Sequence, residues 1–118
     1  MTAKQRGNID FDVVREIARS LPDVEESTSA RGMALKIRGK LLACEAIHKS
    51  AEPNSLMVRI PLNDRELLLA TEPETHYVTA HYRGYPAILV RLSKIDREAL
   101  RDLLESGVRF VGAKKRRS

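Results

Sequence analysis

The chain has 118 residues, of which 42% are hydrophobic, 31% charged and 4% aromatic, which is typical of one globular domain and too short for two ordinary ones. No apolar run approaches the length of about 18 residues that a membrane helix needs, and the N-terminal segment lacks the apolar stretch of a secretory signal, so neither class is expected. The single cysteine, Cys44, cannot form an internal disulfide, which favours a cytoplasmic protein.

The formal net charge of +5 comes from the two ends of the chain. Residues 8 to 113 hold 15 Lys and Arg against 16 Asp and Glu, a balance of −1. We therefore predict a flexible leader over residues 1–8, a single domain over 9–112 and a basic tail over 113–118. The tail either serves solubility alone or attracts polyanions. Its cationic side chains are Lys114, Lys115, Arg116 and Arg117.

Two predicted helices begin directly after an aspartate that can cap them. One follows Asp10 and ends before Pro22, and the other follows Asp96. Apolar residues at spacings of three and four follow each aspartate, as expected for helices that bury one face. Gly107 either caps the C-terminus of the later helix or lies inside a helix that continues toward Phe110.

A further helix is predicted between these two. Asn63 is placed as its N-cap, and Glu66, three residues later, completes a capping-box pattern. Leu67 and Leu68 then begin its core-facing stripe, and Pro73 limits the helix to about two turns.

Alternation of apolar and polar residues predicts five antiparallel strands. Leu42, Cys44 and Ala46 are expected on one face of the second strand, which the turn Arg38-Gly39-Lys40 joins to the first. Glu25 and Glu26 are expected in a polar link before these strands. The element order αβββαββα predicts a two-layer α+β fold, with the helices on one face of a five-stranded antiparallel sheet. The strands cover about residues 33–38, 41–47, 56–60, 77–82 and 88–92.

The other face of this sheet is expected to stay open. Basic residues between apolar and aromatic ones could follow a phosphate backbone and stack bases. The same mixture suits a dimer interface, a protein partner or a solvated sheet face. The residues that this register places there are Lys36, Arg38, Arg59, His81 and Arg91, with Met57, Tyr77, Thr79 and Leu89 between them.

We predict no catalytic, metal or cofactor site. Cys44 and His48 have the residue types of a nucleophile and base, but no motif surrounds them, and Cys44 is expected to point into the core. His76 and His81, five residues apart on a strand, would point to opposite faces, which disfavours a shared metal. Carboxylates are dispersed over caps and helix surfaces, so no pair is placed for acid-base chemistry.

The densest group of unusual side chains lies in the segment HYVTAHYRGYP. His81 and Arg83 stand there among Tyr77, Tyr82 and Tyr85. These residues either form a pocket for a small anion or, with Tyr82 packed inward, brace a turn.

Four segments together resemble the MmcQ/YjbR-like family from about Phe11 to Arg116. They are FDVVREIARSLPDVEES, KIRGK, NDRELLLATEPETHYVTAHYRGYPAILVRL and DREALRDLLESGVRFVGAKKR. The resemblance implies a two-layer αβββαββα domain similar to the secretion-chaperone-like fold. Members are commonly described as DNA-binding, on structural analogy. Many members carry two tryptophans that this chain lacks. This chain has Tyr85 or Ile88 near the position of the first and Val108 near the position of the second.

The leading functional hypothesis is a DNA-binding domain without catalysis. The alternative is a protein-binding or homodimerising module that uses the apolar residues Met57, Tyr77 and Leu89 of the same face. Under the DNA hypothesis the contacts come from the tail, Lys114 to Arg117, and from Arg38, Arg59, His81, Arg83 and Arg91.

Overall fold

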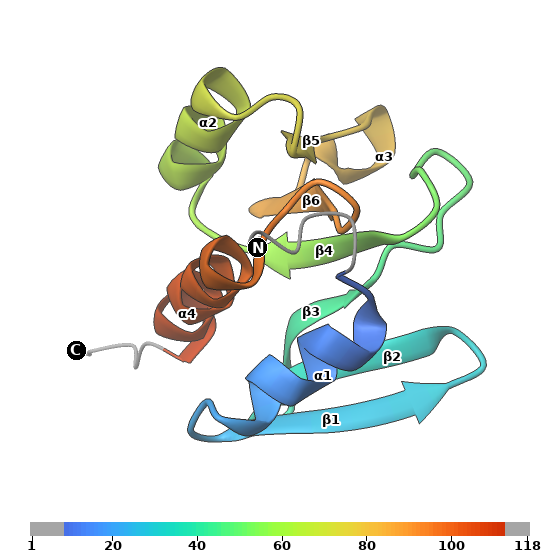
Figure 1. The fold of residues 1–118 in the computed structure, drawn as a ribbon, viewed down its shortest axis with the longest axis vertical. Helices are drawn as coiled ribbons and strands as arrows, with labels where there is room; N and C mark the ends of the chain where they lie inside the picture. The colour runs from blue at the N-terminus through green and yellow to red at the C-terminus, as the bar shows by residue number, and fades with distance from the viewer. Residues whose placement is uncertain (1–8, 113–118) are drawn as a thin grey trace, which may run out of the picture.

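The computed structural model describes residues 9–112, which form an α+β fold (Figure 1). The predicted leader and the basic tail residues Lys114, Lys115, Arg116 and Arg117 lie outside the described residues. Within residues 9–112 no helix has the length and apolar character that would let it cross a membrane. In chain order the elements are α1 (Phe11–Arg19), β1 (Val24–Ser29), β2 (Gly32–Ile37), β3 (Lys40–Glu45), β4 (Ser55–Arg59), α2 (Leu62–Thr71), β5 (His76–Tyr77), α3 (Ala80–Arg83), β6 (Ala87–Arg91) and α4 (Arg97–Gly112).

The antiparallel sheet has six strands rather than the predicted five, in the order β1-β2-β3-β4-β6-β5. The added strand is β1, which we expected to be a polar link. Its sequence lacks the alternation of apolar and polar residues that predicts a strand. The strand forms because its backbone pairs with β2 from Val24↔Ile37 to Ser29↔Gly32. Glu26 of β1 also forms an ion pair with Arg15 of α1, with 2.7 Å between Oε2 and Nε. The predicted element order is therefore wrong at this point.

The main core lies between one face of the sheet and the helices α1 and α4. Helix α1 contacts β1, while α4 contacts β3 and β4, as their positions in Figure 1 indicate. Met33, Leu35 and Ile37 of β2 are buried in this core, as their alternation predicts. Leu68 and Leu69 of α2 pack at its edge.

The caps of the first and last helices are as predicted. The Asp10 carboxylate accepts a hydrogen bond from the Val13 amide at 3.1 Å, and Asp96 accepts one from the Ala99 amide at 2.8 Å. Helix α4 continues through Gly107, the second of the two predicted outcomes. Glycine is required at this position by a close approach to the sheet: a Cβ at Gly107 would lie 2.7 Å from Leu42 Cδ1 and 3.0 Å from the Arg59 carbonyl oxygen.

Replacing Gly107 with Ala is expected to lower the free energy of unfolding by about 2 kcal/mol, because the backbone of β4 cannot yield to the added methyl group. Helix propensity alone would predict a gain of up to about 1 kcal/mol. Gly112→Ala is the matched control, since a Cβ there meets Ile37 at an ordinary 3.8 Å. Urea denaturation of both variants checks the prediction, and a Gly107→Ala protein as stable as the Gly112→Ala protein would contradict it.

The capping box predicted for the second helix is wrong. Helix α2 begins at Leu62, one residue before the proposed cap Asn63, and its N-terminus has no side-chain cap. Leu67, predicted to face the core, is 62% exposed, whereas Arg65 is only 6% exposed. Helix α2 is therefore rotated about its axis relative to the predicted orientation. Arg65, and not Leu67, faces the protein, where it donates hydrogen bonds to carbonyl groups beyond α3, such as that of Tyr85.

A β-bulge in β3 reverses the predicted faces of its second half. Leu35 pairs with Ala43, and the next residue, Lys36, pairs with Leu41, so Leu42 is the extra residue. Leu42 and Ala43 are both buried in the main core, and Cys44 then faces the opposite side of the sheet. Our prediction that Leu42 and Cys44 share a face is therefore wrong.

The sheet face opposite the main core, which we call the outer face, is covered in part. The predicted strand over residues 77–82 is also wrong: β5 ends at Tyr77, and α3 follows. A second, smaller core forms where Tyr82 packs against Met57 and Leu89 of the sheet. Leu89 is fully buried and Met57 only 7% exposed, so this part of the predicted open face is closed.

Candidate functional site

A groove of about 490 Å³ lies on the outer face, over β3 and β4 and beside α3. We call it the outer groove. Leu41, Met57 and Ala87 contribute apolar surface from the sheet, and α3 and the turn after it contribute Tyr82, Tyr85 and Pro86. Its basic side chains are Arg31, Arg59 and His81.

The three basic residues come from separate parts of the chain. Arg59 is the last residue of β4; its Nη1 donates to the Leu41 carbonyl oxygen at 3.4 Å, and its guanidinium lies 5.8 Å from the centre of the Phe110 ring. Arg31 lies in the two-residue turn between β1 and β2, and His81 belongs to α3. Sequence reasoning named Arg59 and His81 but missed Arg31, because a turn residue has no periodicity to place it on a face.

His81 is positioned by a stack with His48 of the loop between β3 and β4. The two ring centres are 3.6 Å apart and the planes differ by 9°. A side-chain hydrogen bond between Ser50 and Thr79, 2.7 Å long, ties the same loop to the start of α3. Lost hydration, followed by the charges of His81 and Lys49, lowers the pKa of His48. This pKa direction favours a neutral His48 beside His81.

The buried Arg65 holds the turn that carries Tyr85 by hydrogen bonds to its backbone. Its Nη1 donates to the carbonyl oxygens of Arg83 at 3.1 Å, Tyr85 at 2.9 Å and Ala87 at 3.4 Å. The backbone on both sides of Pro86 is thereby fixed, while the Tyr85 residue remains 57% exposed. The aromatic edge of the outer groove is therefore built on a rigid turn.

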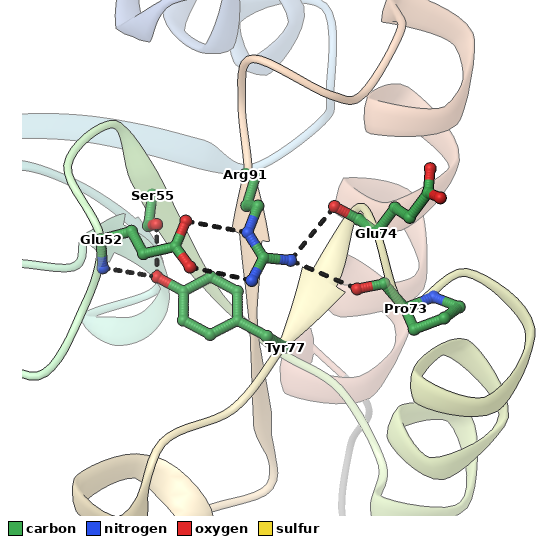
Figure 2. Close-up of polar contacts among 6 residues, drawn as sticks. All are labelled: Glu52, Ser55, Pro73, Glu74, Tyr77 and Arg91. Carbon is green, nitrogen blue, oxygen red and sulfur yellow. Dashed lines mark hydrogen bonds and ion pairs between the residues drawn. The ribbon is translucent and has the colours of Figure 1, made fainter.

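Arg91, a predicted phosphate contact, is already used inside the protein (Figure 2). Its Nε and Nη2 each donate to a different carboxylate oxygen of Glu52 at 2.8 Å. Its Nη1 donates to the carbonyl oxygens of Pro73 at 3.2 Å and Glu74 at 3.1 Å, and the guanidinium lies 4.3 Å from the centre of the Tyr77 ring. These contacts lower the pKa of Glu52, chiefly through its hydrogen bond to Arg91. Arg91 joins three segments and is not free to bind a phosphate.

Tyr77 belongs to the same network rather than to an open face. Its hydroxyl group accepts a hydrogen bond from the Glu52 amide at 2.8 Å and shares another with the Ser55 hydroxyl at 2.6 Å (Figure 2). The loop between β3 and β4 is thus anchored to β5 and β6, which explains why this loop lies against the sheet.

The remaining predicted contacts, Arg38 and Arg83, do not line the outer groove. Arg38 is at the tip of the two-residue turn between β2 and β3, where its φ is 50° and that of Gly39 is 83°, and its side chain lies 3.8 Å from Asp23. Arg83 is exposed on α3. The structure therefore brings together two of the five predicted domain residues, Arg59 and His81.

Cys44 is half-buried on the outer face after the bulge. Burial, followed by the charge of Glu45, raises the pKa of its thiol, which keeps the sulfur protonated and disfavours a nucleophilic role. Within residues 9–112 no group of three or more His, Cys, Asp and Glu is arranged to hold a metal ion.

His76 supplies a pH-dependent term in stability. Its side chain is buried, and lost hydration lowers its pKa despite the opposing effect of Glu72. An unfolded histidine has a pKa of about 6.5, so below that pH the unfolded state binds the extra proton first. We expect this contribution to be complete above pH 6.5 and to decline as the pH falls. Urea denaturation between pH 7.5 and 5 should show a shallower decline for His76→Asn, and an unchanged slope would contradict the assignment.

Comparison with known proteins gives a partial sequence match to uncharacterized relatives. No family model matches the chain. A stretch of 58 residues is 36% identical to the uncharacterized proteins Rv2570 of Mycobacterium tuberculosis and Mb2600 of Mycobacterium bovis. The match covers 47% of this chain and only 45% of the length of these relatives.

The fold has a counterpart among solved structures. The crystal structure of Deinococcus radiodurans protein DR2400, with family-model domain DUF419, superposes with a TM-score of 0.71. The alignment covers 94% of this chain and 86% of that chain at 20% sequence identity. At this identity the likeness shows the shared α+β fold and nothing about function.

Proposed function

We propose that this chain is a small nucleic-acid-binding domain of the MmcQ/YjbR-like type, without catalysis, and that the outer groove contacts the phosphate backbone. The fold shared with the DUF419 domain of DR2400 supports the family resemblance. The free thiol of Cys44 supports a cytoplasmic location.

The observation that carries the proposal is the state of the two arginines in the outer groove. Among the described residues, neither Arg31 nor Arg59 has a carboxylate partner within 4.0 Å, whereas Arg91 has Glu52. No Asp or Glu is among the described residues that line the groove. Guanidinium groups bind phosphate through paired hydrogen bonds, so two arginines without a carboxylate partner, together with His81, form a suitable anion site.

The alternative, a protein partner or homodimer on the same face, has less support. It relied on Met57, Tyr77 and Leu89. Met57 and Leu89 are buried in the second core, and the Tyr77 hydroxyl is engaged by Glu52 and Ser55. These side chains have little surface left for a partner.

Replacing Arg59 with Ala is expected to weaken nucleic-acid binding about tenfold and to reduce the slope of log K against log salt by about 0.7 to 0.9. One charged contact to a phosphate is lost, while the rest of the surface is unchanged. Fluorescence anisotropy with labelled oligonucleotides at about 50 and 200 mM salt measures both effects.

Arg101→Ala is the matched control for charge, because Arg101 donates to Ser20 of the segment after α1, on the opposite face of the sheet. It should bind like the wild type. A chain lacking residues 114–118 separates the domain from its tail. Binding that disappears with the tail, or that Arg59→Ala and Arg101→Ala weaken equally, would overturn the groove as the site.

A further inference from the structure

We infer that the outer groove takes one unstacked nucleotide of a single strand, with its base against Tyr85 and its phosphate toward Arg59 and Arg31. This inference rests on the proposed function and specifies the nucleic acid. The ligand chemistry is a nucleobase joined to a phosphate.

The size and two-sided character of the groove favour such a unit. Its volume of about 490 Å³ lies within the range of roughly 300 to 1,000 Å³ of small-molecule sites. Apolar and aromatic surface from Met57, Tyr82 and Tyr85 adjoins the cationic side chains. An isolated phosphate would use only the cationic part, and an apolar ligand would leave two guanidinium groups unneutralised.

Tyr85 is the residue that separates a single strand from a duplex. It is one of four large hydrophobic residues that are exposed among those described, at 57%, and it lines the groove. Base faces are covered by their neighbours inside a duplex, whereas a single strand offers them to aromatic side chains. A duplex could reach the arginines with its phosphates but could not use this ring.

The backbone that carries the Tyr85 ring is held in place. The Tyr85 amide donates to the Tyr82 carbonyl oxygen at 3.0 Å, its own carbonyl accepts from Arg65 at 2.9 Å, and Pro86 follows with a fixed φ. Because the backbone is already ordered, binding a base costs no further backbone conformational entropy at this turn.

The cationic end is held in a comparable way. Arg59 is directed by the Leu41 carbonyl oxygen and lies near the Phe110 ring, and His81 is stacked on His48. These contacts come from different elements, so the phosphate and the base of one nucleotide would meet groups whose spacing the fold has already set.

The test uses the full chain and labelled oligothymidylate of about 15 nucleotides, compared by anisotropy with a duplex of the same length. We expect the single strand to bind more tightly. Tyr85→Ala should weaken its binding about tenfold, since stacking on an aromatic ring contributes roughly 1 to 3 kcal/mol per base. Tyr85→Phe should retain binding, because the ring remains. Ile47→Ala, which removes an equally exposed apolar residue outside the groove, is the matched control.

The outcomes distinguish this inference from the proposed function. If the duplex binds as tightly as the single strand and only Arg59→Ala weakens binding, the single-strand inference fails and nucleic-acid binding stands. If neither binds, both fail. If thymidine monophosphate competes as tightly per molecule as the oligomer, the groove takes free nucleotides, which overturns the strand as its ligand. Circular dichroism of Tyr85→Ala confirms that the variant is folded.

Discussion

Arg65→Ala is expected to lower the free energy of unfolding by about 3 kcal/mol. The guanidinium is buried and serves three carbonyl oxygens, those of Arg83, Tyr85 and Ala87. Truncation removes these hydrogen bonds, of which the one to Ala87 is buried and the other two are part-buried. A buried acceptor left without a donor costs roughly 1 to 3 kcal/mol. Water that enters the space left by the side chain can satisfy some of these carbonyl groups. We therefore expect the loss in free energy of unfolding to correspond to one or two unsatisfied groups.

Glu66→Gln is the matched control for this variant. Glu66 forms the ion pair of Arg65 at 3.2 Å, but its side chain is 65% exposed. An exposed ion pair contributes about 1 kcal/mol at most. Urea denaturation should therefore show a large loss for Arg65→Ala and a small one for Glu66→Gln. Similar losses would mean that the ion pair, and not the carbonyl contacts, stabilises this region.

Arg65→Ala also has an expected consequence for binding. Arg65 is not itself among the residues that line the outer groove. It acts as a positioning residue through the backbone carbonyls of Tyr85 and Ala87, which do line it. In the folded variant at low temperature, we expect weaker binding of single strands and unchanged binding through the tail.

Leu89→Ala is expected to destabilise the protein by about 3 kcal/mol. Leu89 is fully buried in the second core with Met57 and Ala87. Removal of a buried leucine side chain loses its transfer free energy and leaves a cavity, for about 2 to 5 kcal/mol in all. Thermal unfolding should show a clear decrease in Tm.

Leu67→Ala is the control that makes this result informative. The sequence pattern placed Leu67 in the core and Leu89 on an open face, and the structure reverses both. Leu67 is 62% exposed, so its truncation should change the free energy of unfolding by less than about 0.5 kcal/mol. A larger loss for Leu67→Ala than for Leu89→Ala would restore the sequence-based assignment and contradict the fold.

Some residues of the candidate site could be predicted from strand alternation, and others could not. Arg59 could be named from the sequence because strand alternation placed it on the outer face. His81 was named from a strand that does not form, and it reaches the outer groove from α3 instead. Arg91 satisfied the same pattern, yet its guanidinium is occupied by Glu52, which is 39 residues earlier. Arg31 satisfied no pattern and still lines the groove. A period of two assigns a side chain to a face, but it cannot show which neighbours that face acquires.

The sequence by itself determined the α+β class, the caps at Asp10 and Asp96, and the turn at Arg38-Gly39. It also determined the inner faces of β2 and β6, the latter with Ile88 and Val90 in the main core. The caps and the turn depend on interactions between residues close in the chain, such as a carboxylate with an amide three residues later. The fold class and the strand faces follow from the period of the apolar residues. Tertiary structure alone decided the sixth strand, the bulge at Leu42, the rotation of α2 around Arg65 and the covering of Leu89. These depend on partners distant in sequence, whose backbone pairing and buried hydrogen bonds outweigh local preference.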